Sequence, residues 1–168
     1  PAWKLMAQGN GNKSAAAPAT TLRAPHDFDA ERAVLGAMLL DNSVIPDIVQ
    51  IVKREDFYHV PHQHIFEGML ALISAGQPVE LTLLLDQLRK TGKLEEVGGP
   101  LVVAGLEQFI MATGGAGALA EVVKKKATYR RLMHAAEAIL QDSSAETRDV
   151  ELQLDVAENL IFEISQQA

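Results

Sequence analysis

"LAEVVKKKATYRRLMHAAEAIL", residues 119–140, predicts a long helix with one continuous contact face. Apolar or long-stemmed residues recur in this stretch at alternating steps of three and four: Leu119, Val122, Lys126, Tyr129, Met133, Ala136 and Leu140. Such an alternation is the pattern of a coiled-coil seam. The seam therefore requires a partner helix.

A second run near the end of the sequence has the same spacing. Its members are Val150, Leu154, Ala157, Ile161 and Ile164. The polar stretch 141–149 separates the two runs, which favours an antiparallel helical hairpin. We expect the hairpin over residues 114–168. The glycine-rich segment 114–117 is expected to let the hairpin leave the head at an angle and to permit movement of the hairpin relative to the head.

Upstream of the hairpin, residues 27–113 predict a compact head of about six short helices. Asp29, Ser43 and Thr82 are the expected N-caps, and glycines end the helices. Hydrophobic residues make up 48% of the sequence and aromatic residues 5%, which suits packed helices better than a β-sandwich. The predicted fold class is therefore all-α, a head followed by an antiparallel hairpin.

The first 26 residues lack hydrophobic periodicity and are predicted to be a disordered tail. Residues 1–5 are interpreted as foreign to the native chain, with Met6 as its start. The segment "GNGNKS", residues 9–14, has only a superficial likeness to a phosphate-binding loop. Asn12 stands where that motif needs glycine before Lys13, and no apolar strand precedes it. A linker is the better interpretation.

The composition of the chain argues against several classes of protein. The net charge of −7 disfavours non-specific binding to the phosphates of nucleic acids. The absence of cysteine excludes disulfides and thiolate metal sites and fits a reducing compartment. No apolar run approaches the roughly 20 residues that a membrane-spanning helix needs. We expect a soluble, cytoplasmic protein with no membrane contact.

The segment "EDFYHVPHQHIFEGM", residues 55–69, contains three histidines within six positions, His59, His62 and His64. One interpretation is a metal site in a small metal-dependent hydrolase. Against it, His62 and His64 would point about 200° apart on one helix. The favoured interpretation is structural, with His62 packed inward and bonded to a loop carbonyl or to Asp56. We expect carboxylates on solvent faces, no catalytic residue, no metal site and no cofactor.

One basic concentration stands out in this acidic sequence. It consists of Lys124, Lys125, Arg130 and Arg131 on the first hairpin helix. A solvated helix face is the simpler interpretation of such a run. The sharper hypothesis is a docking stripe for an acidic partner or for phosphates.

Four segments in order resemble a known family, the N-terminal domain of bacterial replicative DNA helicases of the DnaB type. They are "ERAVLGAMLLDNSVI", "EDFYHVPHQHIFEGM", "GQPVELTLLLDQLRKTGKLEEVGG" and "VVKKKATYRRLMHAAEAIL", within residues 27–165. The resemblance implies a structural motif in the head formed by Asp56, Phe57, Tyr58, His62, Ile65 and Phe66. Two segments depart from the family pattern, "MATGGAGALAEVV" at the hairpin entrance and "LVVAGLEQFI" before it.

The resemblance also implies a function. In that family the domain forms a collar on a hexamer, with dimers made through the hairpins and a trimer of dimers in the ring. Its partners are further copies of itself, primase and the helicase loader. ATP, Mg²⁺ and DNA belong to a motor domain, whose GxxxxGK[ST] motif does not occur in this sequence. This fragment is therefore expected not to be an enzyme.

Two other interpretations stay open on the sequence. The helicase-binding domain of bacterial primase has a similar head and hairpin, but it lies at the end of its chain. A generic helical adaptor would be a monomer that does not bind primase.

Overall fold

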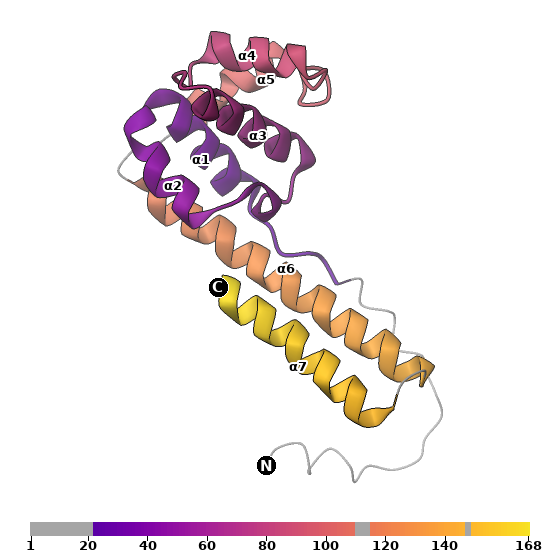
Figure 1. Ribbon diagram of the computed structural model, residues 1–168. Helices are drawn as coiled ribbons and strands as arrows, with labels where there is room; N and C mark the ends of the chain where they lie inside the picture. Colours follow the sequence, from indigo (N-terminus) through magenta and orange to yellow (C-terminus); the bar gives the residue numbers. More distant parts are fainter. Residues whose placement is uncertain (1–21, 110–114, 147–148) are drawn as a thin grey trace, which may run out of the picture.

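The computed structural model describes residues 22–109, 115–146 and 149–168, and these residues form helices, turns and connecting segments without any strand. Figure 1 shows a head made of α1 to α5 and a long antiparallel pair, α6 and α7, that extends from it. The prediction of an all-α head followed by a helical hairpin is confirmed. Most of the expected tail lies outside the described residues.

The elements follow one another with short connections. In chain order they are α1 (Phe28–Leu40), η2 (Asn42–Val44), α2 (Ile45–Ile51), η3 (Arg54–Asp56), α3 (Val60–Ser74), α4 (Leu81–Lys90), α5 (Pro100–Gly105), η4 (Leu106–Phe109), α6 (Ala116–Ala145) and α7 (Val150–Gln167). The η elements are single 3₁₀ turns. The described head thus has five α-helices and three such turns where about six short helices were expected.

The predicted N-caps are wrong. Helix α1 begins after Asp27, whose side chain accepts a hydrogen bond from the backbone N–H of Ala30 at 3.0 Å. Asp29 lies inside the first turn, where its negative charge suits the positive end of the helix dipole. Thr82 lies inside α4, which begins at Leu81 after the N-cap Glu80. Ser43 lies in the turn η2, and the N-cap of α2 is Val44.

The core of the head is built around α1. Val34, Leu35 and Met38 on α1 are completely buried, and they pack against the equally buried Ile65 and Met69 of α3. Each such side chain contributes about 1.5–3 kcal/mol by leaving water. Helix α4 adds two buried leucines to the same cluster. The head is thus a single hydrophobic core.

The first turns of α6 belong to that core. Ala116, Ala120 and Val123 are at most 2% exposed and lie in the same cluster as the residues of α1 and α3. Gly115 is the N-cap of α6 and Gly117 lies within it, packed near Ile51. The described part of the glycine-rich segment is therefore not a joint between head and hairpin. The hairpin leaves the head because α6 simply continues.

Asn42 joins the end of α1 to the segment before α4. Its Nδ2 donates to the carbonyls of Met38, at 3.1 Å, and Val79, at 2.9 Å, while its Oδ1 accepts from the N–H of Val79 at 2.8 Å. Val79 is completely buried, so its backbone groups depend on this side chain. Asn42 therefore holds two parts of the head in register.

Replacing Asn42 with Ala is expected to lower the free energy of unfolding by about 1–3 kcal/mol, because it leaves buried backbone groups of Val79 without partners. Urea denaturation followed by circular dichroism measures this. Asn159→Ala, on the exposed face of α7, is the matched control and should change little. Equal effects of the two substitutions would contradict the bridging role.

Within the described segments, no single helix is both long and apolar enough to cross a membrane. Only the sharply bent pair Phe28–Leu40 with Asn42–Ile51 meets those criteria jointly, and the first of these helices is largely buried in the head.

Candidate functional site

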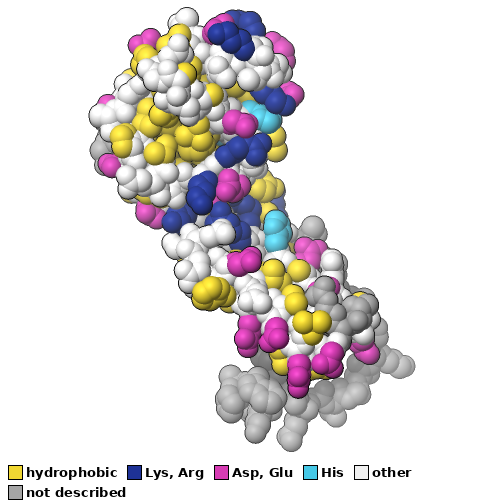
Figure 2. Space-filling view, viewed as in Figure 1, with side chains coloured by type: hydrophobic (Ala, Val, Ile, Leu, Met, Phe, Trp, Pro, Cys, Tyr) yellow, Lys and Arg dark blue, Asp and Glu magenta, His cyan; other side chains and the backbone are white. Residues whose placement is uncertain are grey.

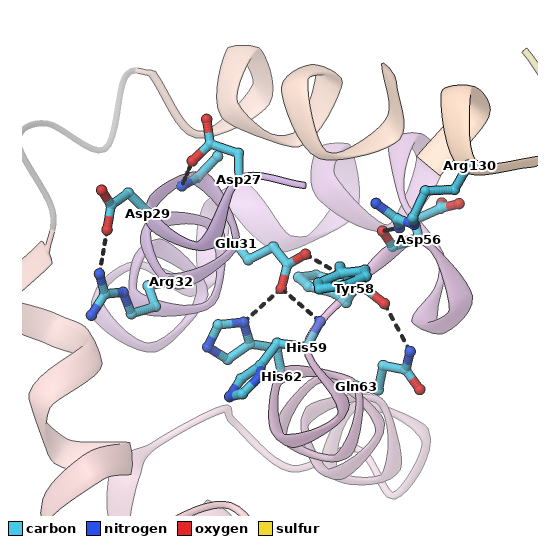
Figure 3. A network of polar contacts seen from close by, with 12 residues as sticks. Asp27, Asp29, Glu31, Arg32, Asp56, Tyr58, His59, His62, Gln63 and Arg130 are labelled. Carbon is cyan, nitrogen blue, oxygen red and sulfur yellow. Dashed lines mark hydrogen bonds and ion pairs between the residues drawn. The ribbon is translucent and has the colours of Figure 1, made fainter. Parts of the chain in front are cut away.

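A buried carboxylate lies at the centre of the polar network shown in Figure 3. Glu31 of α1 is 1% exposed, and its Oε1 accepts from the backbone N–H of Tyr58 at 2.6 Å. Its Oε2 accepts from the backbone N–H of His59 at 3.3 Å and from Nδ1 of His62 at 2.6 Å. Three donors therefore satisfy one carboxylate. The arrangement ties α1 to the start of α3.

The partner of His62 was predicted incorrectly. The sequence suggested a loop carbonyl or Asp56, and it placed carboxylates on solvent faces. Instead, Glu31 shares the buried face of α1 with Val34 and Leu35, three and four positions on. That helical spacing was a usable signal, because a carboxylate at such a position must find donors inside the protein.

The three histidines have separate roles. The His59 ring packs edge-on against His62, with centroids 4.7 Å apart, and its burial there lowers the pKa of His59, assisted by the neighbouring His62 ring. His64 lies near Glu67 and Glu96, with its Nε2 3.4 Å from the latter. Across the described ranges, no group of three His, Cys, Asp or Glu side chains is placed to hold a metal ion. The three rings thus make separate contacts within the head.

The structural motif lies where the head meets the hairpin. Phe57, Ile65 and Phe66 are at most 1% exposed, and the two phenylalanine rings lie 4.9 Å apart. Tyr58 is the exposed member of the motif, and its ring stacks on His26 at 4.5 Å. The motif thus combines core packing with a surface contact to the segment before α1.

Asp56 connects the head to α6. It is 3% exposed, and its carboxylate accepts from the backbone N–H of Lys53 at 2.8 Å and forms an ion pair with Arg131. Arg130 donates to the carbonyls of Asp56, at 2.5 Å, and Pro25, at 2.7 Å. Burial lowers the pKa of Arg130, against the raising influence of nearby carboxylates. Both arginines therefore serve internal contacts.

The proposed basic docking stripe needs correction for this reason. Arg130 and Arg131 are not free surface cations, since each is bonded to Asp56. Lys124 and Lys125 lie further back on α6 beside Tyr129, and their docking role stays a prediction. Figure 2 shows several Lys and Arg side chains gathered where the head meets the hairpin, while Asp and Glu are scattered over the visible face, with a group toward the far end of the hairpin.

Replacing Arg131 with Met is expected to destabilise the fold by about 2–3 kcal/mol, because the buried Asp56 carboxylate loses its cation. Lys125→Met removes an exposed charge from the same helix and should change stability by less than about 0.5 kcal/mol. Thermal and urea unfolding of both variants give the comparison. If the lysine variant were the less stable one, the anchoring role of Arg131 would be wrong.

The predicted seam residues divide into two groups. Leu119 and Val122 pack against the head core, and Met133, Ala157 and Ile164 are partly buried. The remaining members are between 45% and 71% exposed: Tyr129, Leu140, Val150, Leu154 and Ile161. Their role as a seam between copies stays a prediction.

A different face of α6 contacts α7. Ala135 and Ala138 of α6 line a shared groove with Leu160 and Ile164 of α7. Small side chains on α6 let the two helices approach closely. This face was not predicted, because alanine gives a weak hydrophobic signal beside the larger residues of the exposed seam.

Comparison with known proteins fits this architecture. The model of the family described as "DnaB-like helicase N terminal domain" matches residues 23–125, more than half of the chain. The chain is 34% identical over 142 residues to the "Replicative DNA helicase DnaB" of Geobacillus stearothermophilus, covering 84% of this chain and 31% of that protein. It is also 34% identical over 142 residues to the "Replicative DNA helicase DnaC" of Bacillus subtilis, with the same coverage.

A solved structure agrees over nearly its whole length. The crystal structure of the N-terminal domain of DnaB helicase from Mycobacterium tuberculosis superposes with a TM-score of 0.80 and 31% sequence identity. The match covers 84% of this chain and 99% of that one. In contrast, the chain spans about a third of the length of the two helicases.

Proposed function

The chain belongs to the family of DnaB-like helicase N-terminal domains, and we propose that it forms the N-terminal collar of a hexameric replicative DNA helicase. In this role it joins copies of the parent protein and docks other replication proteins. The observation that carries the proposal is an exposed apolar face along the hairpin of a chain in this family. That face suits self-association better than catalysis.

The hairpin cannot cover its own apolar residues. No described residue of α7 is buried, and Leu154, Ile161 and Phe162 are 58%, 45% and 60% exposed. An apolar surface of this kind commonly marks an interface between proteins. Since Leu154 and Ile161 keep the spacing of a coiled-coil seam, a second hairpin is the natural cover. We propose dimers made in this way, and three dimers in the ring.

Other activities are assigned to the rest of the parent protein. We propose that its remaining two thirds carry the ATP- and Mg²⁺-dependent motor and most of the DNA contacts. The collar contributes no catalytic group, because its buried ion pairs serve to hold helices together. Primase and the helicase loader are the proposed docking partners, and the cytoplasm is the proposed location.

The alternatives have less support. The relatives described above are replicative helicases, which favours the helicase collar over the helicase-binding domain of primase. A histidine-based hydrolase would need an available carboxylate near His62. Both oxygens of Glu31 are already occupied by three donors, which leaves it poorly suited to that chemistry.

The docking role is tested by calorimetric titration of this chain with the C-terminal domain of primase from the same organism. Light scattering on the same samples defines the concentration of each assembly. Saturable heat is expected, and Lys124→Glu combined with Lys125→Glu should weaken it if these lysines form part of the docking surface. Absence of heat over a range of temperatures would contradict primase docking by the isolated domain.

A further inference from the structure

The segment that precedes α1 lies against α6 instead of turning away from the hairpin. Residues 22–27 have no regular secondary structure, and Figure 1 shows them beside α6. Nη1 of Arg130 donates to the carbonyl of Pro25 at 2.7 Å, a contact between residues 105 positions apart. A side chain of the long helix therefore holds the backbone of this segment in place.

Aromatic stacking fixes the same segment to the head. The ring of His26 lies nearly parallel to that of Tyr58, with centroids 4.5 Å apart, and it also contacts the ring of Phe28 at 4.7 Å. Nδ1 of His26 lies 2.7 Å from the carbonyl oxygen of Ala24. Residues 24–27 are partly buried as a result. The segment is thus fixed at two places and follows a defined path along α6.

An open groove with a volume of about 550 Å³ lies between this segment and α6. Leu22 and Ala24 form one wall of the groove. Met133, Ala136 and Leu140 form the apolar part of the other wall. Three polar side chains of α6 complete the lining, Arg130, His134 and Glu137. The groove is therefore a mainly apolar surface that two separate parts of the chain build together.

The groove borders the seam along α6. Met133, Ala136 and Leu140 have the 3-4 spacing described above, and Leu140 is 69% exposed. A segment that covered the seam would bury this leucine. Leu22 is itself 76% exposed, so the segment stands beside the seam and leaves it open. A second hairpin that packed on the seam would meet the segment as well.

A second copy of the chain is the occupant that suits this groove. In a coiled coil, each apolar side chain of one helix enters a hole between residues of the other. Here the segment supplies a further wall for such a hole. The hairpin also carries exposed apolar side chains of its own, among them Leu154 and Ile161, which can enter an apolar groove. In a twofold dimer each copy would both offer a groove and fill one.

We propose that residues 22–26 form part of the interface between two copies, a role that rests on the proposed self-association through the hairpin. An apolar side chain from the hairpin of the second copy lies between Leu22 and Leu140. Arg130 and His26 are positioning residues, because they fix the backbone that carries Leu22. The interface therefore includes a part of the chain that belongs to neither hairpin helix.

The first test is the substitution Leu22→Asp in the full chain. Because Leu22 is 76% exposed, the new carboxylate stays hydrated in the monomer, and circular dichroism should show unchanged helicity. In the dimer it would enter an apolar contact, and we expect about tenfold weaker association by sedimentation equilibrium. Leu101→Asp is the matched control, since Leu101 is 88% exposed on α5 and does not line the groove. It should leave association unchanged.

A second measurement locates the segment directly. The sequence has no cysteine, so a spin label can be attached to a single introduced thiol. Arg23→Cys places the label on the exposed residue next to Leu22. This chain is mixed with ¹⁵N-labelled chain that carries no spin label. We expect broadening of hairpin amide signals in the ¹⁵N-labelled copy. A label at Lys90→Cys, on the exposed end of α4, should leave those signals unchanged.

The outcomes separate this interface from the hairpin dimer itself. If the chain forms dimers, equal association of the Leu22→Asp variant would overturn the role of the segment, as would an absence of broadening from the label at position 23. Stronger association of the Leu22→Asp variant would also overturn it, and would indicate that part of the same chain competes for the groove. If the unmodified chain stays monomeric at every concentration, the proposed self-association fails, and the role of the segment fails with it.

Discussion

Replacing Glu31 with Ala is expected to lower the free energy of unfolding by about 3–5 kcal/mol. The substitution leaves His62 and the backbone N–H groups of Tyr58 and His59 inside the head without their acceptor. It also opens a cavity beside α1. Because a domain of this size has a total stability of about 5–15 kcal/mol, much of the margin would disappear. Urea denaturation of the purified variant gives the value.

Two other substitutions separate the contributions. Glu31→Gln keeps the volume and one acceptor oxygen, so its cost should be intermediate. Glu67→Ala removes an exposed carboxylate of α3 from ion pairs at the surface, and should cost less than about 1 kcal/mol. A Glu31→Ala variant as stable as the Glu67→Ala variant would show that the buried network does not hold α1 and α3 together.

Replacing Ile161 with Asp should weaken self-association strongly while leaving the hairpin folded. Ile161 is 45% exposed in the single chain, so a carboxylate there remains hydrated in the monomer. In a dimer formed across the exposed seam the same carboxylate would be buried without a partner. A central interface residue of this kind is worth about 2 kcal/mol or more, which corresponds to at least a roughly 30-fold weaker dimer. Sedimentation equilibrium measures the change.

The matched control lies on the head. Leu40→Asp places the same charge at a residue that is 57% exposed and away from the hairpin. It should leave the mass of the assembly unchanged. Circular dichroism of both variants checks that the helices persist. Identical assembly of the Ile161→Asp variant and the unmodified chain would contradict the proposed interface.

The general fold was predictable because helix-forming signals in this sequence are local. The 3-4 alternation across residues 119–140 and 150–164 specified the hairpin, since helical periodicity depends only on neighbouring positions. The N-caps were misplaced because the boundaries depend on which polar side chain reaches a free N–H, a matter of one residue. Asp29 was predicted as the N-cap of α1, whereas Asp27, two residues earlier, is the one that accepts from the free N–H of Ala30.

The candidate site was less predictable. The pairing of Glu31 with His62 joins residues 31 positions apart, and only the packing of α1 on α3 brings them together. In the same way, the ion pair from Asp56 to Arg131 spans 75 positions. The basic run therefore looked available for a partner, although half of the predicted stripe anchors the hairpin. Long-range polar pairing leaves no periodic trace in a single sequence.

The continuity of α6 has a mechanical consequence. Its 30 residues run without a break from the core of the head to the tip of the hairpin, a length of about 45 Å at the rise of an α-helix. Such a helix resists bending, and its first turns are fixed among α1 and α2. A force applied at the tip of the hairpin would therefore rotate the head and the hairpin together as one rigid unit. In an assembly of such chains, changes of shape would have to occur at the contacts between copies rather than inside each one.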